Sequence, residues 1–529
     1  MALVLEYYHF SSVPLIPLIA TLIIILGSIS VALIRNKSAA TTRSGHLVGK
    51  LPPGPRKLPV IGNLHQLIGK LPHHRLRELA HKHGPHVMHL QLGELSYIVI
   101  SSPEAAAQVM KSHDLSFATR PWLLVADVVF YGAKDVGLAP YGSYWRQMRK
   151  ICVVELLSSK RVLSLRPVRE SEASKLVAAI SAGAGVDLGK ILRSSTSSLV
   201  FRAAFGMAAN DTEEKFTEII SGVSDALDGF TVSDLFPSVK FLPALTGYRS
   251  RLTKLHLAAD GILDDIINQH KLARRRNSSE PAAQHNNNNN NYSDDLVDVL
   301  LNLQEDGSEL DSPLTIEAIK AVILDMFLAG TETTSTTIEW AMSELMRHPS
   351  VMQRAQDEVR RTFCGKIYVN EEGLHNLTYL DLVIQESLRL HPAIPLLLPR
   401  EARERVEILG YEIPSQTKVI INAWAIGRDP RCWREADKFI PERFLDRPSD
   451  YNGNNLEFIP FGSGRRMCPG MSFGLATVKL MLTNLLYHFD WKLPSGITHE
   501  SLDMTECTGA GLKRYHSLHL IPVAYDAMP

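Results

Sequence analysis

The sequence predicts a mainly α-helical protein with small β-sheets, and the spacing of its apolar residues carries that prediction. Long patterns with helical spacing fill the middle of the chain, whereas short strand patterns lie only at 86–100, at 407–421 and near the C-terminus. Strands do not alternate with helices, and no glycine-rich phosphate loop follows a strand. We therefore do not expect the chain to bind a nicotinamide dinucleotide itself.

Charge and cysteine content exclude further classes of protein. The 529 residues contain 56 Lys and Arg residues and 56 Asp and Glu residues, which gives no net charge. A nucleic-acid partner would require a basic face, so we expect none. Five widely spaced cysteines do not form a disulfide scaffold. Four of them are interpreted as ordinary reduced thiols: Cys152, Cys364, Cys432 and Cys507.

Residues 1–34 have the pattern of an N-terminal transmembrane signal-anchor. No charged residue occurs from Tyr7 to Ile34, and the apolar run from Val13 to Ile34 is about long enough to span the hydrocarbon core of a bilayer. Basic residues follow this run, which places the body of the protein on the cytosolic side. A cleaved signal peptide is the alternative, but it would have a shorter apolar region with positive charge before it.

Residues 35–57 are then a basic and proline-rich hinge, and 58–529 form the folded domain. The hinge contains Leu51-Pro52-Pro53-Gly54-Pro55. Prolines at this density exclude a helix or a central strand. We expect a stiff, extended link between the anchor and the domain.

The stretch from Leu314 to Arg347 predicts one long central helix, capped by Ser312 or Thr315 and ending before Pro349. Its middle reads Ala329-Gly330-Thr331-Glu332-Thr333-Thr334, a run of poor helix formers. A local violation of this kind in a core helix marks either a functional turn or a kink. The residues alone leave both interpretations open.

A second specialised segment runs from Phe461 to Gly470 and places Cys468 in a glycine-rich loop before a helical pattern at 473–487. The nearby Arg466 and the helix N-terminus favour a thiolate over a thiol. No second Cys or His lies at zinc-binding spacing. The cysteine is therefore a nucleophile, a redox thiol or the ligand of another metal.

The segment resembles the haem-binding loop of the cytochrome P450 family, F-x-x-G-x-R-x-C-x-G, at every defined position. These positions are Phe461, Gly464, Arg466, Cys468 and Gly470. Four more segments resemble P450 motifs in order and spacing: the oxygen-activating turn at 329–333, Glu386-Ser387-Leu388-Arg389, Pro441-Glu442-Arg443-Phe444, and Trp145-Arg146-Gln147-Met148-Arg149. The resemblance covers essentially the whole chain and is greatest to plant P450s of specialised metabolism, in their terpenoid-hydroxylase branch.

This resemblance implies haem b (iron protoporphyrin IX) as the cofactor, with Cys468 as the axial ligand of the iron. It implies that Thr333 hydrogen-bonds dioxygen, that Glu332 relays protons, and that Ala329 and Gly330 leave space above the haem. The haem propionates would be held by Trp145, Arg149, Arg400 and Arg466. Glu386, Arg389 and Arg443 would form a buried ion network behind the cysteine loop.

The implied activity is that of a monooxygenase in the endoplasmic reticulum membrane, spanning it once, with a cytosolic catalytic domain. Electrons would come from NADPH–cytochrome P450 reductase. The substrate would be a small hydrophobic metabolite, with a terpenoid preferred and a lipid-tailed phenolic or an alkaloid as alternatives. A reductase-independent haem-thiolate isomerase or dehydratase, and a haem- or lipid-binding protein without turnover, are the other classes.

The resemblance also implies which residues line the substrate pocket, and these are mostly apolar. They are Phe327, Leu328, Ile394, Leu397, Leu398 and Gly509. The remaining histidines, including His73 and His74, are interpreted as solvated side chains and not as a metal site.

Overall fold

The computed structural model describes residues 50–525, except 70, 207–210, 228–230, 280–294, 308–309, 367, 446–450, 508 and 510. The expected anchor at 1–34 and the first part of the hinge, 35–49, lie outside the described residues. Within the described part, no helix is both long enough and apolar enough to cross a membrane.

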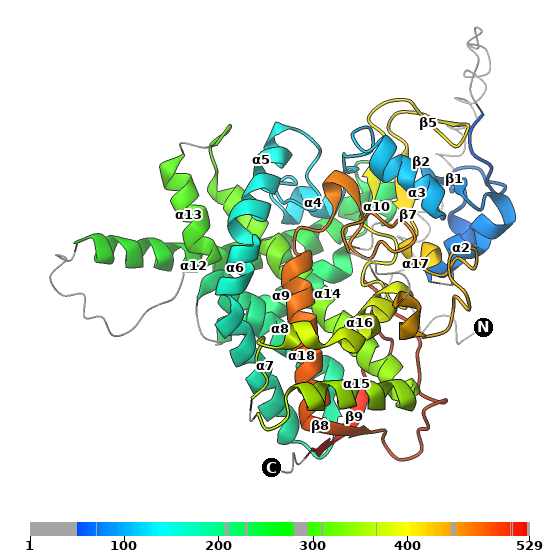
Figure 1. Ribbon diagram of the computed structural model, residues 1–529. Coiled ribbons are helices and arrows are strands. Elements are labelled where there is room, and N and C mark those ends of the chain that lie inside the picture. The colour runs from blue at the N-terminus through cyan, green and yellow to red at the C-terminus, as the bar shows by residue number, and fades with distance from the viewer. Residues whose placement is uncertain are drawn as a thin grey trace, which may run out of the picture.

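Helices make up most of the fold, as expected, and the strands form small sheets (Figure 1). The principal helices are α2 (Pro72–His83), α3 (Pro103–Ala107), α4 (Leu124–Val129), α5 (Ser143–Ile151), α6 (Ser159–Ser164), α7 (Arg166–Ser181), α8 (Leu188–Phe205), α9 (Asp211–Ala226), α10 (Val232–Leu235), α11 (Leu242–Leu245), α12 (Tyr248–Ser279), α13 (Leu296–Asp306), α14 (Ile316–Arg347), α15 (Pro349–Thr362), α16 (Thr378–Leu390), α17 (Ala423–Ile426) and α18 (Met471–His488).

Helix α14 is the predicted central helix. Thr315 caps its start, because its side-chain oxygen accepts a hydrogen bond from the Ala318 N–H at 3.3 Å. Most of its side chains are buried on every side, which explains why its apolar pattern is continuous and not confined to one face. It packs against α8 and α18, so it runs through the middle of the protein (Figure 1).

The strands form three sheets. The largest has the order β1-β2-β7-β4, and β2 pairs with β7 in parallel register, with Ile98 opposite Val419. The early strand cluster therefore shares a sheet with β7 of the late cluster although more than 300 residues separate them, whereas β5 and β6 of the late cluster form a sheet of their own. The strands are β1 (Val87–Leu92), β2 (Leu95–Ile100), β3 (Val186–Asp187), β4 (Arg400–Glu401), β5 (Val406–Ile408), β6 (Tyr411–Ile413), β7 (Lys418–Ile421), β8 (Phe489–Lys492) and β9 (His519–Ala524).

The described end of the proline-rich segment packs on this sheet. The N–H of His89 in β1 donates to the Pro53 carbonyl at 2.9 Å. A Cβ on Gly54 would lie 2.0 Å from the His89 carbonyl oxygen, so only glycine fits there. The segment is extended, and it adjoins the edge of the sheet.

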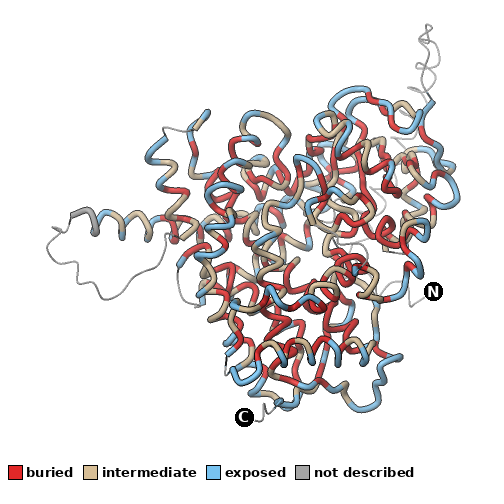
Figure 2. Tube along the Cα trace, viewed as in Figure 1, coloured by how far each residue is buried: buried red, intermediate tan, exposed pale blue. Residues whose placement is uncertain are grey.

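The core surrounds α14, and buried residues gather along the middle of the protein, whereas residues 271–276 of α12 are exposed or half-buried (Figure 2). Phe327 of α14 is fully buried in this core. Its ring lies 4.7 Å from that of Phe216 and about 6 Å from those of Phe201 and Phe205. Aromatic rings from α8 and α9 thus enclose Phe327, and its expected contact with substrate stays a prediction.

We predict that Phe327→Ala destabilises the protein more than it changes substrate choice. Removing a buried Phe leaves a cavity and costs about 3–5 kcal/mol. Chemical unfolding of the haem-loaded protein measures this loss. Leu328→Ala is the matched control, because Leu328 is only half-buried on the same turn. Unchanged stability with altered product distribution in Phe327→Ala would contradict the assignment.

Candidate functional site

The cysteine loop is a tight turn that closes on itself just before α18. The Cys468 N–H donates to the Phe461 carbonyl at 3.0 Å, and the Met467 N–H donates to the Gly464 carbonyl at 3.0 Å. Gly464 has a positive φ of 73°, and a Cβ there would lie 2.2 Å from the Met110 carbonyl oxygen. The glycine therefore supplies both the backbone conformation and the close approach.

The Cys468 thiol at the end of this loop is accessible to solvent. Burial nevertheless raises its pKa, because protein surrounds it on most sides. The N–H groups of Gly470 and Met471 at the start of α18, and the charge of Arg149, act in the opposite direction. Desolvation and the helix terminus thus act on the thiol in opposite directions, and a Cys468 thiolate as the haem ligand stays a prediction.

Buried arginines gather near this loop. Arg466 donates to the carbonyls of Ala118, Val136 and Ala139 at 2.6, 3.2 and 2.5 Å. Its guanidinium carbon lies 4.1 Å from the centre of the Trp145 ring. Burial, and next the positive charge of Arg400, lowers the pKa of Arg466 to about 9.

Sequence reasoning missed Arg120, a third member of this set. Burial is the main reason that the pKa of Arg120 lies well below its ordinary value. The positive charges of Arg466 and Arg400 lower this pKa further. Its guanidinium donates to the carbonyls of Gly137, Leu398 and Pro399 at 2.8–2.9 Å. Within the sequence its only signal is a single charge inside the otherwise uncharged run 115–126.

The other predicted cationic residues lie near the same place. Arg400 donates to the Ser463 carbonyl at 2.9 Å and pairs with Asp114 at 3.3 Å. Arg149 is half-buried, and its charge acts on both Cys468 and Arg466. Like charges crowded together in a buried region are unfavourable unless an anion binds among them. The arrangement therefore fits a ligand with more than one carboxylate.

The unusual turn of α14 contains two polar groups in defined contacts. The Thr333 hydroxyl donates to the Ala329 carbonyl at 2.6 Å. Glu332 forms an ion pair with Lys513 of the C-terminal loop at 2.9 Å. Ala329 is exposed, whereas most of the helix is buried.

Gly330 lies where α14 approaches α8. A Cβ at this position would lie 3.0 Å from the Val200 side chain of α8. The glycine allows the two helices to pack closely, and its expected role in leaving space for dioxygen stays a prediction.

Two acids that were not among the predicted site residues, the buried Asp135 and the half-buried Asp325, join the α14 helix to the loop before α5. Asp325 accepts hydrogen bonds from the N–H groups of Val136 and Gly137 at 3.1 and 2.9 Å. Burial, and next the negative charge of Asp325, raises the pKa of Asp135 to about 8. The loop that receives the Arg466 hydrogen bonds is thereby fixed to α14.

Glu386, Arg389 and Arg443 form one ion network. Arg389 contacts Glu386 through two hydrogen bonds of 2.7 and 2.8 Å, and Arg443 donates to the same carboxylate at 2.9 Å. Both α16 residues are fully buried. Arg389 also donates to the carbonyls of Gly427 and Ala436 at 2.6 Å. The network fixes the segment 427–443 against α16.

The remaining residues expected to line a pocket lie mostly on one segment. Ile394, Leu397 and Leu398 are half-buried between α16 and β4. Leu397 has a positive φ of 51°, which is unusual for a bulky residue. Gly509 is exposed, with its two neighbours outside the described residues. Leu328 is half-buried and packs against the α8–α9 side of the core.

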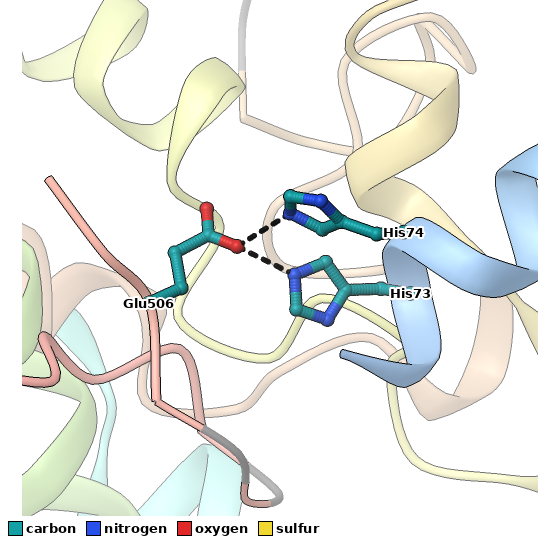
Figure 3. A group of neighbouring side chains, drawn as sticks. All are labelled: His73, His74 and Glu506. Carbon is teal, nitrogen blue, oxygen red and sulfur yellow. Dashed lines mark hydrogen bonds and ion pairs between the residues drawn. The ribbon is translucent and has the colours of Figure 1, made fainter. Parts of the chain in front are cut away.

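His73 and His74 are not two solvated side chains, and this interpretation is corrected. His73 is only 4% exposed. Both rings direct their Nε2 atoms at one carboxylate oxygen of Glu506 (Figure 3). A sequence separation of more than 430 residues concealed this contact.

Comparison with known proteins identifies the family. The family model described as cytochrome P450 matches residues 52–517. The chain belongs to the cytochrome P450 family. It is a cytochrome P450 monooxygenase that is similar to plant P450s. Its family implies a haem cofactor, and the accessible Cys468 thiol beside buried arginines fits a flat, anionic haem.

Two relatives and one solved structure illustrate the similarity. The P450 is 51% identical to desmethyl-deoxy-podophyllotoxin synthase of Sinopodophyllum hexandrum, covering 95% of this chain and 96% of that protein. It is 49% identical to premnaspirodiene oxygenase of Hyoscyamus muticus, covering 90% and 93%. A zebrafish cytochrome P450 solved with progesterone shares the fold, with a TM-score of 0.72, 24% identity and coverage of 86% and 100%.

We predict that Glu386→Ala loses haem incorporation and not only turnover. The change leaves two guanidinium groups without their carboxylate, which costs about 3–5 kcal/mol. Haem per protein and the midpoint of chemical unfolding measure the effect. Glu435→Ala is the control, because it removes only a solvent-exposed pair with Lys438 and should leave haem content and stability unchanged. A stable Glu386→Ala protein with normal haem content would contradict the prediction.

A second prediction concerns the loop itself. Gly464→Ala should abolish haem binding, since the new Cβ would collide with the Met110 backbone. Gly474→Ala, within α18, is the control because a Cβ there meets nothing within 4 Å. Absorbance of the haem band relative to protein distinguishes the two variants. Equal haem content in both would show that the loop adapts to a side chain at 464.

Proposed function

We propose that this P450 hydroxylates a hydrophobic plant terpenoid with dioxygen, using electrons from NADPH–cytochrome P450 reductase. The observation that carries the proposal is the Cys468 loop beside α14, with the charges of Arg149 and Asp325 acting on the thiol. Haem, when bound, supplies the activation of dioxygen and the oxidation of a C–H bond.

We infer that Cys468 holds the haem iron. The family loop places its thiol at the start of α18, where two backbone N–H groups favour negative charge on sulfur. A thiol that coordinates a metal is deprotonated, which compensates for the desolvation that raises its pKa in the protein alone. Arg120, Arg400, Arg466 and Trp145 would hold the propionates through charge-assisted hydrogen bonds.

Thr333 and Glu332 are proposed to manage protons on the other side of the haem. The Thr333 hydroxyl lies one turn from the exposed Ala329 and carries a proton that it now donates to the Ala329 carbonyl. Glu332 keeps a carboxylate on the next residue, paired with Lys513. A hydroxyl next to an acid suits repeated proton delivery, the task of general acid catalysis.

We predict that Thr333→Val uncouples the enzyme. Valine keeps the shape of threonine and removes the hydroxyl, so product formation should fall by about 100-fold while NADPH consumption continues. The ratio of product to NADPH consumed measures this. Thr334→Val is the matched control, since Thr334 is a buried neighbour on the same helix. Equal coupling in both variants would remove Thr333 from the proton route.

The reductase is proposed to dock on the side of the protein that carries Cys468. Arg146 and Lys150 of α5 and Arg465 of the cysteine loop are exposed and basic there. Surface charges of this kind steer an acidic partner and make association sensitive to salt. We further propose that residues 13–34 anchor the enzyme in the endoplasmic reticulum membrane, because their length and lack of charge match a bilayer span.

A terpenoid is the preferred substrate because the chain is 49% identical to premnaspirodiene oxygenase over most of its length. The half-buried apolar segment at 394–398 favours a ligand with few polar groups. The 51% identity to desmethyl-deoxy-podophyllotoxin synthase makes a phenolic substrate the second candidate.

A substrate panel tests the proposal. Microsomes with full-length P450 and reductase receive terpenoid hydrocarbons, polycyclic phenolics and alkaloids, with NADPH present or absent. We expect an NADPH-dependent product that is heavier by one oxygen atom from a terpenoid. Turnover of phenolics alone would exclude the terpenoid assignment, and conversion without NADPH would favour an isomerase or dehydratase.

A further inference from the structure

Three potential metal ligands converge away from the cysteine loop. His73 and His74 lie in the first turn of α2, and Glu506 lies in the segment that precedes β9. The Nε2 atoms of both histidines lie 2.8 and 2.7 Å from the same Glu506 oxygen, Oε2 (Figure 3). The three ligand atoms all lie within 4.8 Å of one another.

The surroundings hold these side chains in place. The His74 ring stacks on Trp424 with centroids 4.2 Å apart, and the His73 ring meets the same indole edge-on at 5.1 Å. The Asn422 side chain donates to the His73 carbonyl at 2.9 Å and fixes the start of α2. Ligands whose rotamers are set by packing bind a metal with little loss of entropy.

A third nitrogen at the site, His391 Nδ1, has no hydrogen-bond partner among the described residues. The His391 side chain is only 7% exposed, and its Nδ1 atom is buried and unsatisfied among the described residues. This Nδ1 lies 3.9 Å from Glu506 Oε1, while its Nε2 is bonded to Glu344 at 2.7 Å. A buried polar atom without a partner is costly and indicates a ligand or water that is bound there.

The site is also accessible. His74 keeps a side-chain exposure of 40%, while His73 and Glu506 are buried. A cavity of about 320 Å³ is lined by His74, His391, Glu506, Glu344 and Arg428. Such a volume holds several waters at about 30 Å³ each, enough to hydrate an ion on entry.

The charges around the cavity partly offset one another. Arg428 is the cation that faces Glu506, and it is held over the Trp424 ring at 4.0 Å and bonded to the Leu390 carbonyl. Glu344 and Asp437 supply further carboxylates at the cavity, and Arg347 supplies a second guanidinium. Three carboxylates against two guanidinium groups leave the site attractive to a divalent cation.

We propose that His73, His74 and Glu506 bind a zinc ion, with His391 beside it as a further ligand or a partner of Glu506. Two imidazoles and one carboxylate are a standard zinc ligand set with an open position. Ligands at 2.0–2.2 Å from zinc lie about 3.3 Å apart in a tetrahedron, so the two Nε2 atoms move outward from Oε2 by about half an ångström. The ion would connect α2 to the C-terminal segment.

A second group of three potential ligands in the described part of the chain contains one histidine and two aspartates, and it is less suitable for zinc. His270, Asp295 and Asp298 also bring three ligand atoms together. There Arg274 donates to an Asp298 carboxylate oxygen at 3.2 Å and occupies the place of a cation. No orphaned histidine nitrogen lies beside it among the described residues. It serves as the internal comparison for the experiment.

The test is the zinc content of full-length, haem-loaded enzyme prepared without a polyhistidine tag. After dialysis against a weak chelator, elemental analysis should give about one zinc per haem iron in the wild type. His74→Ala should reduce the zinc content at least ten-fold, because it removes one of the ligands. The variant should still fold, because alanine is well tolerated in a helix. His83→Ala, exposed at the other end of α2, is the matched control and should retain zinc.

A second measurement keeps the proposal falsifiable if His74→Ala folds poorly. Wild-type enzyme stripped with a strong chelator and titrated with zinc alone should take up one equivalent and gain thermal stability. Absence of saturable uptake would overturn the proposal. Zinc that is lost in His270→Ala and retained in His74→Ala would likewise overturn it and assign the ion to the other group.

Discussion

The carboxylate of Glu386 accepts hydrogen bonds from two guanidinium groups and one backbone N–H in a region without solvent exposure. A charge in that place is tolerated only because its partners are complete. Through Arg389 and Arg443 it fixes the segment 427–443, which carries no long helix or strand of its own. That segment leads toward the cysteine loop, so the position of Cys468 depends on an interaction remote from the chemistry.

The region around the cysteine loop differs from the Glu386 network, because its buried charges are those of arginines. Arg120, Arg400 and Arg466 are buried, the charge of Arg400 lowers the pKa of the other two, and their hydrogen bonds go largely to backbone carbonyls. Glu386 contacts two guanidinium groups, whereas of these three arginines only Arg400 forms an ion pair among the described residues, with Asp114. The region around the loop therefore suits an anionic cofactor such as the haem that the family implies.

Much of the fold and of the candidate site could be predicted from the sequence, because these parts depend on patterns of residues close together in the chain. The apolar run and Thr315 define α14, the glycine spacing defines the cysteine loop, and the short strands lie where their patterns indicate. Contacts between distant segments could not be predicted in the same way. The parallel pairing of β2 with β7, the enclosure of Phe327 and the approach of Val200 to Gly330 each depend on elements far apart in the chain.

His73 and His74 show most clearly which contacts the sequence cannot predict. A polar residue at the start of an amphipathic helix is usually solvated, and nothing near His73 indicates that Glu506 covers it. The pKa of Cys468 shows a related limit. The sequence reveals the helix terminus and the arginine that lower this pKa, but it does not reveal the burial that raises it.

The most direct test of the account is the reduced carbon monoxide difference spectrum of the full-length protein beside Cys468→Ser. We predict a strongly red-shifted Soret band in the wild type and its absence in the variant, because only a thiolate ligand produces that shift. A folded, haem-replete wild type without the band, or a variant that keeps it, would contradict the assignment of Cys468 as the iron ligand.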